Sequence, residues 1–255
     1  MRYDETNLAI RSGSNSDSDL GWHIIRAVTP NFQPMLLGRR AEPFDDPDWL
    51  FELKYDGFRA VAVIADGRCQ LVSRNGNVFK SFDILASKLP KEIRADSALI
   101  DGEIVCLDSR GRSQFSDLFY RRKEPIFVAF DLLSADGQDF RPLPLIDRKL
   151  ELGRRLHSQL THVLYCQHLE LNGRGLFALA CKHDLEGIVA KWKFGKYLSG
   201  RDETTWFKIR NGSYSQWGGR DKIFDRPQEP VLGAGWDACT VAATASAESP
   251  WAILA

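Results

Sequence analysis

Short apolar runs with the character of β-strands dominate the middle of the chain. Residues 58–65 (FRAVAVIA) and 69–73 (CQLVS) flank Asp66-Gly67. This dipeptide is typical of a two-residue hairpin turn, because glycine tolerates positive φ at no steric cost. Further strands are predicted where apolar or alternating runs end at Gly, Asp, Ser or a basic residue: 98–108, 126–134, 186–192 and 205–210.

Helical spacing of apolar residues occurs in only three segments: 81–95, 144–160 and 174–184. These segments do not alternate with the predicted strands in the regular rhythm of a parallel βαβ sheet. The hairpin links instead favour an α+β fold, with antiparallel sheets flanked by helices.

Both ends of the chain lack such patterns. Residues 11–19 (RSGSNSDSD) are almost free of apolar side chains, which predicts a mobile N-terminal segment over 1–30. Residues 227–255 mix Pro and Gly with an Ala/Ser-rich run, and we expect an irregular C-terminal extension there. One compact domain is therefore expected over 31–226.

Charge and cysteine usage narrow the class of protein. The 255 residues carry 34 Lys+Arg and 34 Asp+Glu, so the net charge is zero and the chain does not coat nucleic acid by bulk charge. There is no apolar run long enough for a membrane span, and the polar first residues lack the core of a signal peptide. The five scattered cysteines suggest buried free thiols. We therefore expect a cytoplasmic location (nucleoid-associated in a bacterium) and no membrane partner.

Basic residues are nevertheless concentrated locally. Residues 182–226 contain ten Lys/Arg against six acids. A second basic stretch over 110–123 is interleaved with Phe and Tyr. Such stretches fit either a groove that follows a phosphate backbone or ordinary charged surface, and the sequence does not choose between them.

The sharpest motif is Glu52-Leu53-Lys54-Tyr55-Asp56-Gly57-Phe58-Arg59, which places a lysine just after an apolar strand. An acid, a glycine and an arginine follow the lysine at once. Five further clusters lie at or near strand ends: Ser73-Arg74-Asn75-Gly76, Asp101-Gly102-Glu103, Phe130-Asp131, Glu186-Gly187-Ile188-Val189-Ala190-Lys191 and Trp206-Phe207-Lys208-Ile209-Arg210.

These six clusters, in this order, resemble the adenylation domain of ATP-dependent DNA ligases of the bacterial end-joining type. The resemblance covers about residues 34–226. It implies the nucleotidyltransferase (ATP-grasp-like) fold and a reaction that passes through a covalent lysyl-AMP. Nicked duplex DNA is the implied substrate, in DNA repair or recombination.

The resemblance also implies a role for each motif residue. Lys54 is the expected nucleophile, and a lysine amine attacks only when it is unprotonated, which nearby cations and partial burial favour. The expected catalytic group is Lys54, Asp56, Lys191 and Lys208. Phe130 is expected to stack on adenine, and Glu52 to help recognise its exocyclic amine. The nucleotide-binding set is Glu52, Arg59, Arg74, Glu103, Phe130, Lys191 and Lys208.

Two carboxylates in a phosphate site suit Mg²⁺ or Mn²⁺. Glu186 is the favoured metal ligand; Glu103 is the second candidate, with contact to the ribose as its alternative role.

In one respect the sequence departs from the family pattern. Full-length ligases follow this domain with an OB-fold of about a hundred residues, whereas 47 residues follow Lys208 here (255 − 208). The sequence therefore predicts a domain without an OB-fold, which implies modest DNA affinity and a DNA-end-binding or clamp-supplying repair partner. The alternatives are an RNA ligase, another covalent nucleotidyltransferase such as a capping guanylyltransferase, or a non-catalytic nucleic-acid-binding remnant.

Overall fold

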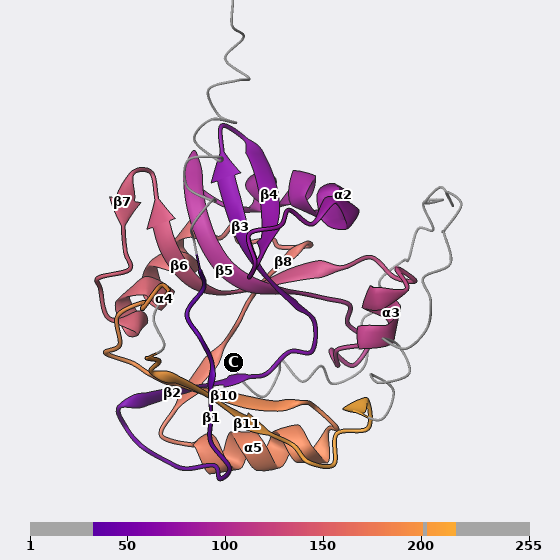
Figure 1. Ribbon diagram of the computed structural model, residues 1–255, viewed down its shortest axis with the longest axis vertical. Coiled ribbons are helices and arrows are strands. Elements are labelled where there is room, and N and C mark those ends of the chain that lie inside the picture. Colours follow the sequence, from indigo (N-terminus) through magenta and orange to yellow (C-terminus); the bar gives the residue numbers. More distant parts are fainter. Residues whose placement is uncertain (1–32, 201–202, 218–255) are drawn as a thin grey trace, which may run out of the picture.

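The computed structural model describes residues 33–200 and 203–217. The predicted N-terminal segment over 1–30 and the extension over 227–255 lie outside these residues. Within them, two sheets lie opposite each other, and helices flank them (Figure 1). The expected mixture of helices and sheets is confirmed, and the structure shows that there are two sheets.

The first sheet has five strands in the order β1-β11-β10-β2-β9. Helix α5 (Gly173–Lys182) packs on its outer face (Figure 1). The strands are β1 (Gly38–Arg39), β2 (Trp49–Leu53), β9 (His168–Glu170), β10 (Gly187–Trp192) and β11 (Trp206–Arg210).

The second sheet has six strands, five in the order β4-β3-β5-β6-β7 with β8 paired to β6. These strands are β3 (Phe58–Ala65), β4 (Arg68–Ser73), β5 (Ser97–Val105), β6 (Ile126–Ala135), β7 (Gln138–Asp139) and β8 (Val163–Tyr165). The Asp66-Gly67 turn joins β3 and β4 with positive φ at both residues, as predicted.

Not every strand pair is antiparallel. β1 runs parallel to β11, and β8 runs parallel to β6, so the expectation of purely antiparallel sheets is wrong at these two positions. Both exceptions are strands of two or three residues that reach the sheet from a distant part of the chain. Such short strands carry too few residues to show an alternating pattern.

The predicted helix over 81–95 is broken into three pieces: η1 (Lys80–Phe82), α2 (Asp83–Lys88) and η2 (Leu89–Glu92). Pro90 lies at the start of η2, where its missing N–H and fixed φ disfavour continuing the preceding α-helix. The other helices are α3 (Phe115–Phe119) and α4 (Leu145–Arg155). Within the described ranges no helix is both long enough and apolar enough to cross a bilayer.

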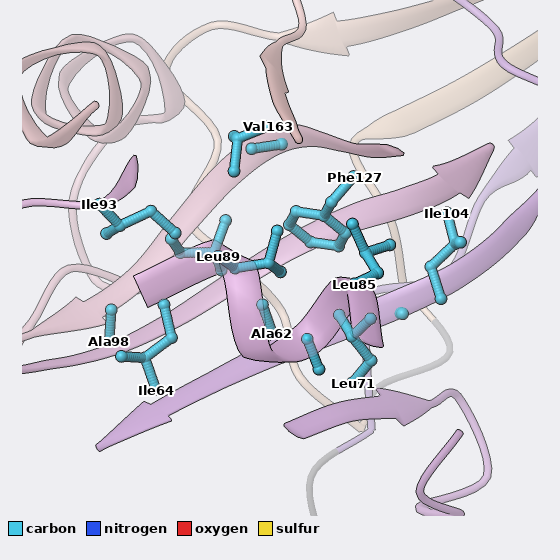
Figure 2. Close-up of a cluster of buried hydrophobic side chains, with 14 of the residues drawn as sticks. Ala62, Ile64, Leu71, Leu85, Leu89, Ile93, Ala98, Ile104, Phe127 and Val163 are labelled. Carbon is cyan, nitrogen blue, oxygen red and sulfur yellow. The ribbon is translucent and has the colours of Figure 1, made fainter. Parts of the chain in front are cut away.

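The largest core lies between the second sheet and the segment from α2 to η2 (Figure 2). Leu89, Ile100 and Phe127 are fully buried in it. A second cluster, which includes Met35, Leu133 and Trp206, joins the two sheets. Cys106 and Cys166 are buried free thiols as expected, but Cys181 on α5 is exposed.

Candidate active site

A pocket of about 430 Å³ opens between the two sheets. Both sheets contribute to its walls. Six of the residues predicted from the sequence line it: Glu52, Lys54, Arg59, Glu103, Phe130 and Lys191. The folding of distant motifs around one pocket makes it the candidate active site.

Lys54 follows the last residue of β2 and stands at the junction between the sheets. Its backbone N–H donates to the carbonyl of Gly187, 2.9 Å away. Its Nζ donates to Glu186 Oε2 at 2.6 Å, and its side chain is 17% exposed. Lys54 and Glu186 also line a second pocket of about 260 Å³ with Ser113 and Tyr214. The amine therefore lies between two cavities, beside a buried carboxylate.

Gly187 has to be a glycine for this arrangement. Its φ is +137°, and a Cβ there would lie 2.1 Å from the carbonyl oxygen of Ile209. Glycine alone permits both the backbone conformation and this approach of β10 to β11. The Glu-Gly pair thus fixes Glu186 next to Lys54.

Glu52 is a buried carboxylate held by two lysines. Lys149 Nζ donates to its Oε1 at 2.6 Å, and Lys191 Nζ lies 2.6 Å from its Oε2. Burial alone would raise the pKa of Glu52, but the two positive charges outweigh it and hold the pKa below its usual value. Glu52 is therefore an ionised hydrogen-bond acceptor at the wall of the pocket.

An aromatic pair, Phe130 and Trp206, forms another part of the pocket wall. Phe130 and Trp206 pack edge to face, with ring centroids 5.9 Å apart. Lys191 Nζ lies 4.3 Å from the Phe130 centroid and 4.1 Å from the Trp206 centroid, a cation–π arrangement. The buried Trp206 indole N–H has no hydrogen-bond partner among the described residues. The two rings offer an aromatic surface on which a flat ligand can stack.

Glu103 projects from β5 beside Lys54 and Arg59. Burial raises the pKa of its carboxyl to about 8, because the attraction of the two cations does not compensate for the loss of water, and Glu186 and Asp101 add repulsion. The described residues contain no group of three or more potential metal-ligating side chains. Glu103 and Glu186 are close enough to interact electrostatically, and as two carboxylates they would fit Mg²⁺ only if phosphate oxygens and water completed its shell.

Asp56 and Arg59 have buried protein partners. Asp56 donates through its backbone N–H to Ser113 Oγ at 3.2 Å, and it accepts a hydrogen bond from the Tyr214 hydroxyl at 3.2 Å. Arg59 forms a bidentate pair with Asp101, at 3.1 and 2.7 Å. These contacts tie Asp56, two residues after Lys54, to Ser113 and Tyr214. Arg59 lines the pocket, but its charge is already paired.

Lys208 and Arg74 do not line the pocket. Lys208 lies on β11, and its pKa is lowered by partial burial and then by the positive charges of Arg210 and Lys54. Lys208 is thus within electrostatic range of Lys54. Arg74 lies exposed in the turn after β4, and the described structure does not bring it to the pocket.

Sequence reasoning missed several residues of the site. Trp206 is the first residue of the Trp-Phe-Lys-Ile-Arg motif, in which only Lys208 was assigned a role. Its position at the start of a strand with alternating apolar residues was the signal that could have identified it. Lys149 lies in the predicted helix over 144–160 and looked like any lysine of an amphipathic helix. Tyr55 and Cys166 complete the walls of the pocket near Glu52.

Comparisons with known proteins agree with this geometry. A family model described as ATP dependent DNA ligase domain matches residues 37–210. The SPbeta prophage-derived DNA ligase-like protein LigB of Bacillus subtilis (strain 168) is 30% identical over 192 residues, which cover 72% of this chain and 68% of LigB. The multifunctional non-homologous end joining DNA repair protein LigD of Mycobacterium tuberculosis (strain ATCC 25618 / H37Rv) is 32% identical over 195 residues, or 74% of this chain.

The solved structures give the same result. A mycobacterial DNA ligase D complexed with ATP and MES superposes with a TM-score of 0.59 at 29% identity, over 71% of this chain and 60% of that one. The match covers only 23% of the M. tuberculosis LigD sequence, so the chain corresponds to one part of that larger protein. With five of its six motifs assembled around one pocket and a family model matched over residues 37–210, the chain belongs to the family of ATP-dependent DNA ligase domains.

Proposed function

We propose that this chain seals nicks in duplex DNA through a covalent AMP on Lys54. The observation that carries the proposal is the position of Lys54, between a pocket with aromatic walls and a second cavity, with its Nζ 2.6 Å from Glu186. A nucleophilic lysine needs an acceptor for its proton and a bound substrate within reach. The relatives' names, DNA ligase-like protein and DNA ligase D, support the same reaction.

In the first step the Lys54 amine gives up a proton, for which Glu186 Oε2 is the nearest acceptor. The nitrogen then attacks the α-phosphorus of ATP, a P–N bond forms, and the bond to pyrophosphate breaks. AMP next passes to the 5′-phosphate of the nick, which restores the lysine. Attack by the 3′-hydroxyl then closes the strand and releases AMP.

The pocket supports a role for several residues in holding ATP. Adenine stacks on Phe130 and takes the place of the Lys191 ammonium, which is then free to reach the phosphates. Glu52 accepts a hydrogen bond from the adenine amine. Lys208 is near enough to Lys54 to stabilise charge that develops at the α-phosphate. Glu103 and Glu186 are the residues that would hold Mg²⁺, and the ion would supply positive charge beside the phosphates.

The test is transfer of label from α-labelled ATP in the presence of Mg²⁺. Wild type is expected to become labelled, Lys54→Ala is expected to remain unlabelled, and Lys182→Ala on the exposed end of α5 is the matched control that retains the label. If wild type stays unlabelled but closes a nick that already carries AMP, the self-adenylation step is refuted. If it does neither, the whole proposal fails.

Substrate class and cellular role form a further part of the proposal. The end-joining names of the LigD relatives favour repair of DNA breaks, with a DNA-end-binding protein as partner. Competition between ATP and GTP for the label, and between nicked DNA and nicked RNA for sealing, separates a DNA ligase from an RNA ligase or a guanylyltransferase. A preference for GTP or for nicked RNA would overturn this assignment.

A further inference from the structure

One buried cation beside the pocket is not used by the steps described above. Lys149 lies on α4, is fully buried, and does not line the pocket. Its ammonium is surrounded by acceptors: Glu52 Oε1 at 2.6 Å, the Cys166 carbonyl at 2.9 Å and the Phe130 carbonyl at 3.4 Å. Three acceptors match the three N–H donors of a lysine, so the side chain is locked in place.

We propose that Lys149 is a positioning residue that sets base specificity: it holds one oxygen of Glu52 and leaves the other to select purines with a 6-amino group. The inference rests on the proposed nucleotide site, and it adds a residue that does not touch the nucleotide. Glu52 Oε1 is taken by Lys149, whereas Oε2 is the oxygen shared with Lys191, which lines the pocket.

The two lysines differ in what happens when a base enters. The Lys191 ammonium lies about 4 Å from the ring centroids of both Phe130 and Trp206, so a base that stacks on the same side of Phe130 displaces it. Glu52 then loses one of its two countercharges. Lys149 lies behind the wall and is not displaced. It therefore provides the countercharge that Glu52 keeps in the nucleotide complex.

A buried carboxylate without a countercharge tends to take up a proton. The protonated form has an O–H donor and can accommodate a carbonyl at position 6 of the purine, whereas the ionised form only accepts. An ionised Glu52 therefore binds adenine through its amine and disfavours hypoxanthine or guanine, which present an oxygen there. A site built to hydrogen-bond one group discriminates strongly against a ligand that lacks it.

AMP and inosine monophosphate test this inference, because they differ in the group at position 6 and neither can form the lysyl adduct. Their dissociation constants are measured by isothermal titration calorimetry on the full chain. We expect wild type to favour AMP by roughly 10- to 100-fold, as for a hydrogen bond to a charged group. Lys149→Met and Glu52→Gln are each expected to reduce this preference to about threefold or less, since either change removes the fixed ionised acceptor.

Arg148 provides the matched control. It neighbours Lys149 on α4, is equally buried, and pairs with Asp131 outside the pocket, with Nη2 2.7 Å from Oδ2. Arg148→Met also breaks a buried ion pair, so it reports the general effect of loosening this helix. We expect it to lower thermal stability and to leave the AMP preference unchanged. If Lys149→Met does not fold, Lys149→Gln removes the charge while keeping a donor.

Three results would overturn the inference: a wild type without preference, a Lys149 variant that keeps the full preference, or an equal loss in Arg148→Met. These outcomes are independent of the labelling of Lys54, because they measure binding alone. A chain that prefers AMP but never becomes labelled refutes the proposed self-adenylation step and leaves the specificity inference standing.

Discussion

The raised pKa of Glu103 leads to a quantitative prediction about stability. Its carboxyl has a pKa of about 8 in the folded protein against 4.5 for the ordinary group, so between these values the folded state holds a proton that the unfolded state has lost. Stability contributed by this group therefore falls as pH rises from 4.5 to 8. At about 1.4 kcal/mol per pH unit, the penalty at pH 7 is about 3 kcal/mol, and because solvent reaches part of the side chain we expect about 1–3 kcal/mol.

Glu103→Gln removes this titration while keeping the size of the side chain. Urea denaturation is expected to show a variant more stable than wild type by that amount at pH 7, with little difference near pH 4.5. Glu124→Gln is the control, because the exposed Glu124 carboxyl has its pKa lowered by a hydrogen bond from Lys88 and its amide should bring no gain at pH 7.

The same variant should be the poorer enzyme. A neutral amide is a weaker ligand for Mg²⁺ than a carboxylate, so lysine adenylation is expected to slow while stability rises. If Glu103→Gln is no more stable relative to wild type at pH 7 than at pH 4.5, the reasoning about the buried carboxyl is refuted.

Three further substitutions test the frame around the site. Arg59→Ala leaves the buried Asp101 without its bidentate partner and should cost about 3–5 kcal/mol, measured as a fall in the urea midpoint; an unchanged midpoint would contradict the assigned pair. Gly57→Ala should reduce the yield of folded protein, since a Cβ there would lie 2.1 Å from the Ile104 carbonyl, and a normal melting temperature would argue against that close approach. Gly67→Ala, with φ of +73° but open space around it, should cost only about 1 kcal/mol in the same denaturation assay, and a loss as large as that of Gly57→Ala would contradict the turn.

The motif residues could be predicted because their clusters, in this order, resemble the ligase family. Most of them lie at or near the end of a recognisable strand, although Phe130 lies in the middle of β6. Strand ends gather where the sheets meet, so Glu52, Glu103 and Lys191 converge although up to 139 positions separate them (191 − 52). The roles assigned to these residues in ATP binding and catalysis remain predictions. The side chains with which these residues pair could not be predicted from the sequence, because a bidentate pair such as Arg59–Asp101 depends on the register of β3 against β5.

Lys149 shows why part of the site could not be predicted. A lysine in an amphipathic helix normally faces water, and the helical pattern contains nothing that marks this one as buried. Its burial is decided by the packing of α4 against β6, which brings the ammonium to Glu52, 97 positions earlier in the chain. Likewise, the sequence around Arg74 does not indicate that the turn after β4, in which this exposed residue lies, is away from the pocket.

The short link from Lys54 to Gly57 joins β2 of the first sheet to β3 of the second. Its two ends are bonded to different parts of the molecule: the Lys54 N–H to Gly187 on β10, and the Asp56 N–H to Ser113 in the loop before α3. The backbone of Lys54 is therefore tied to both sheets at once. The position of Lys54 relative to a bound phosphate therefore depends on how the two sheets pack against each other.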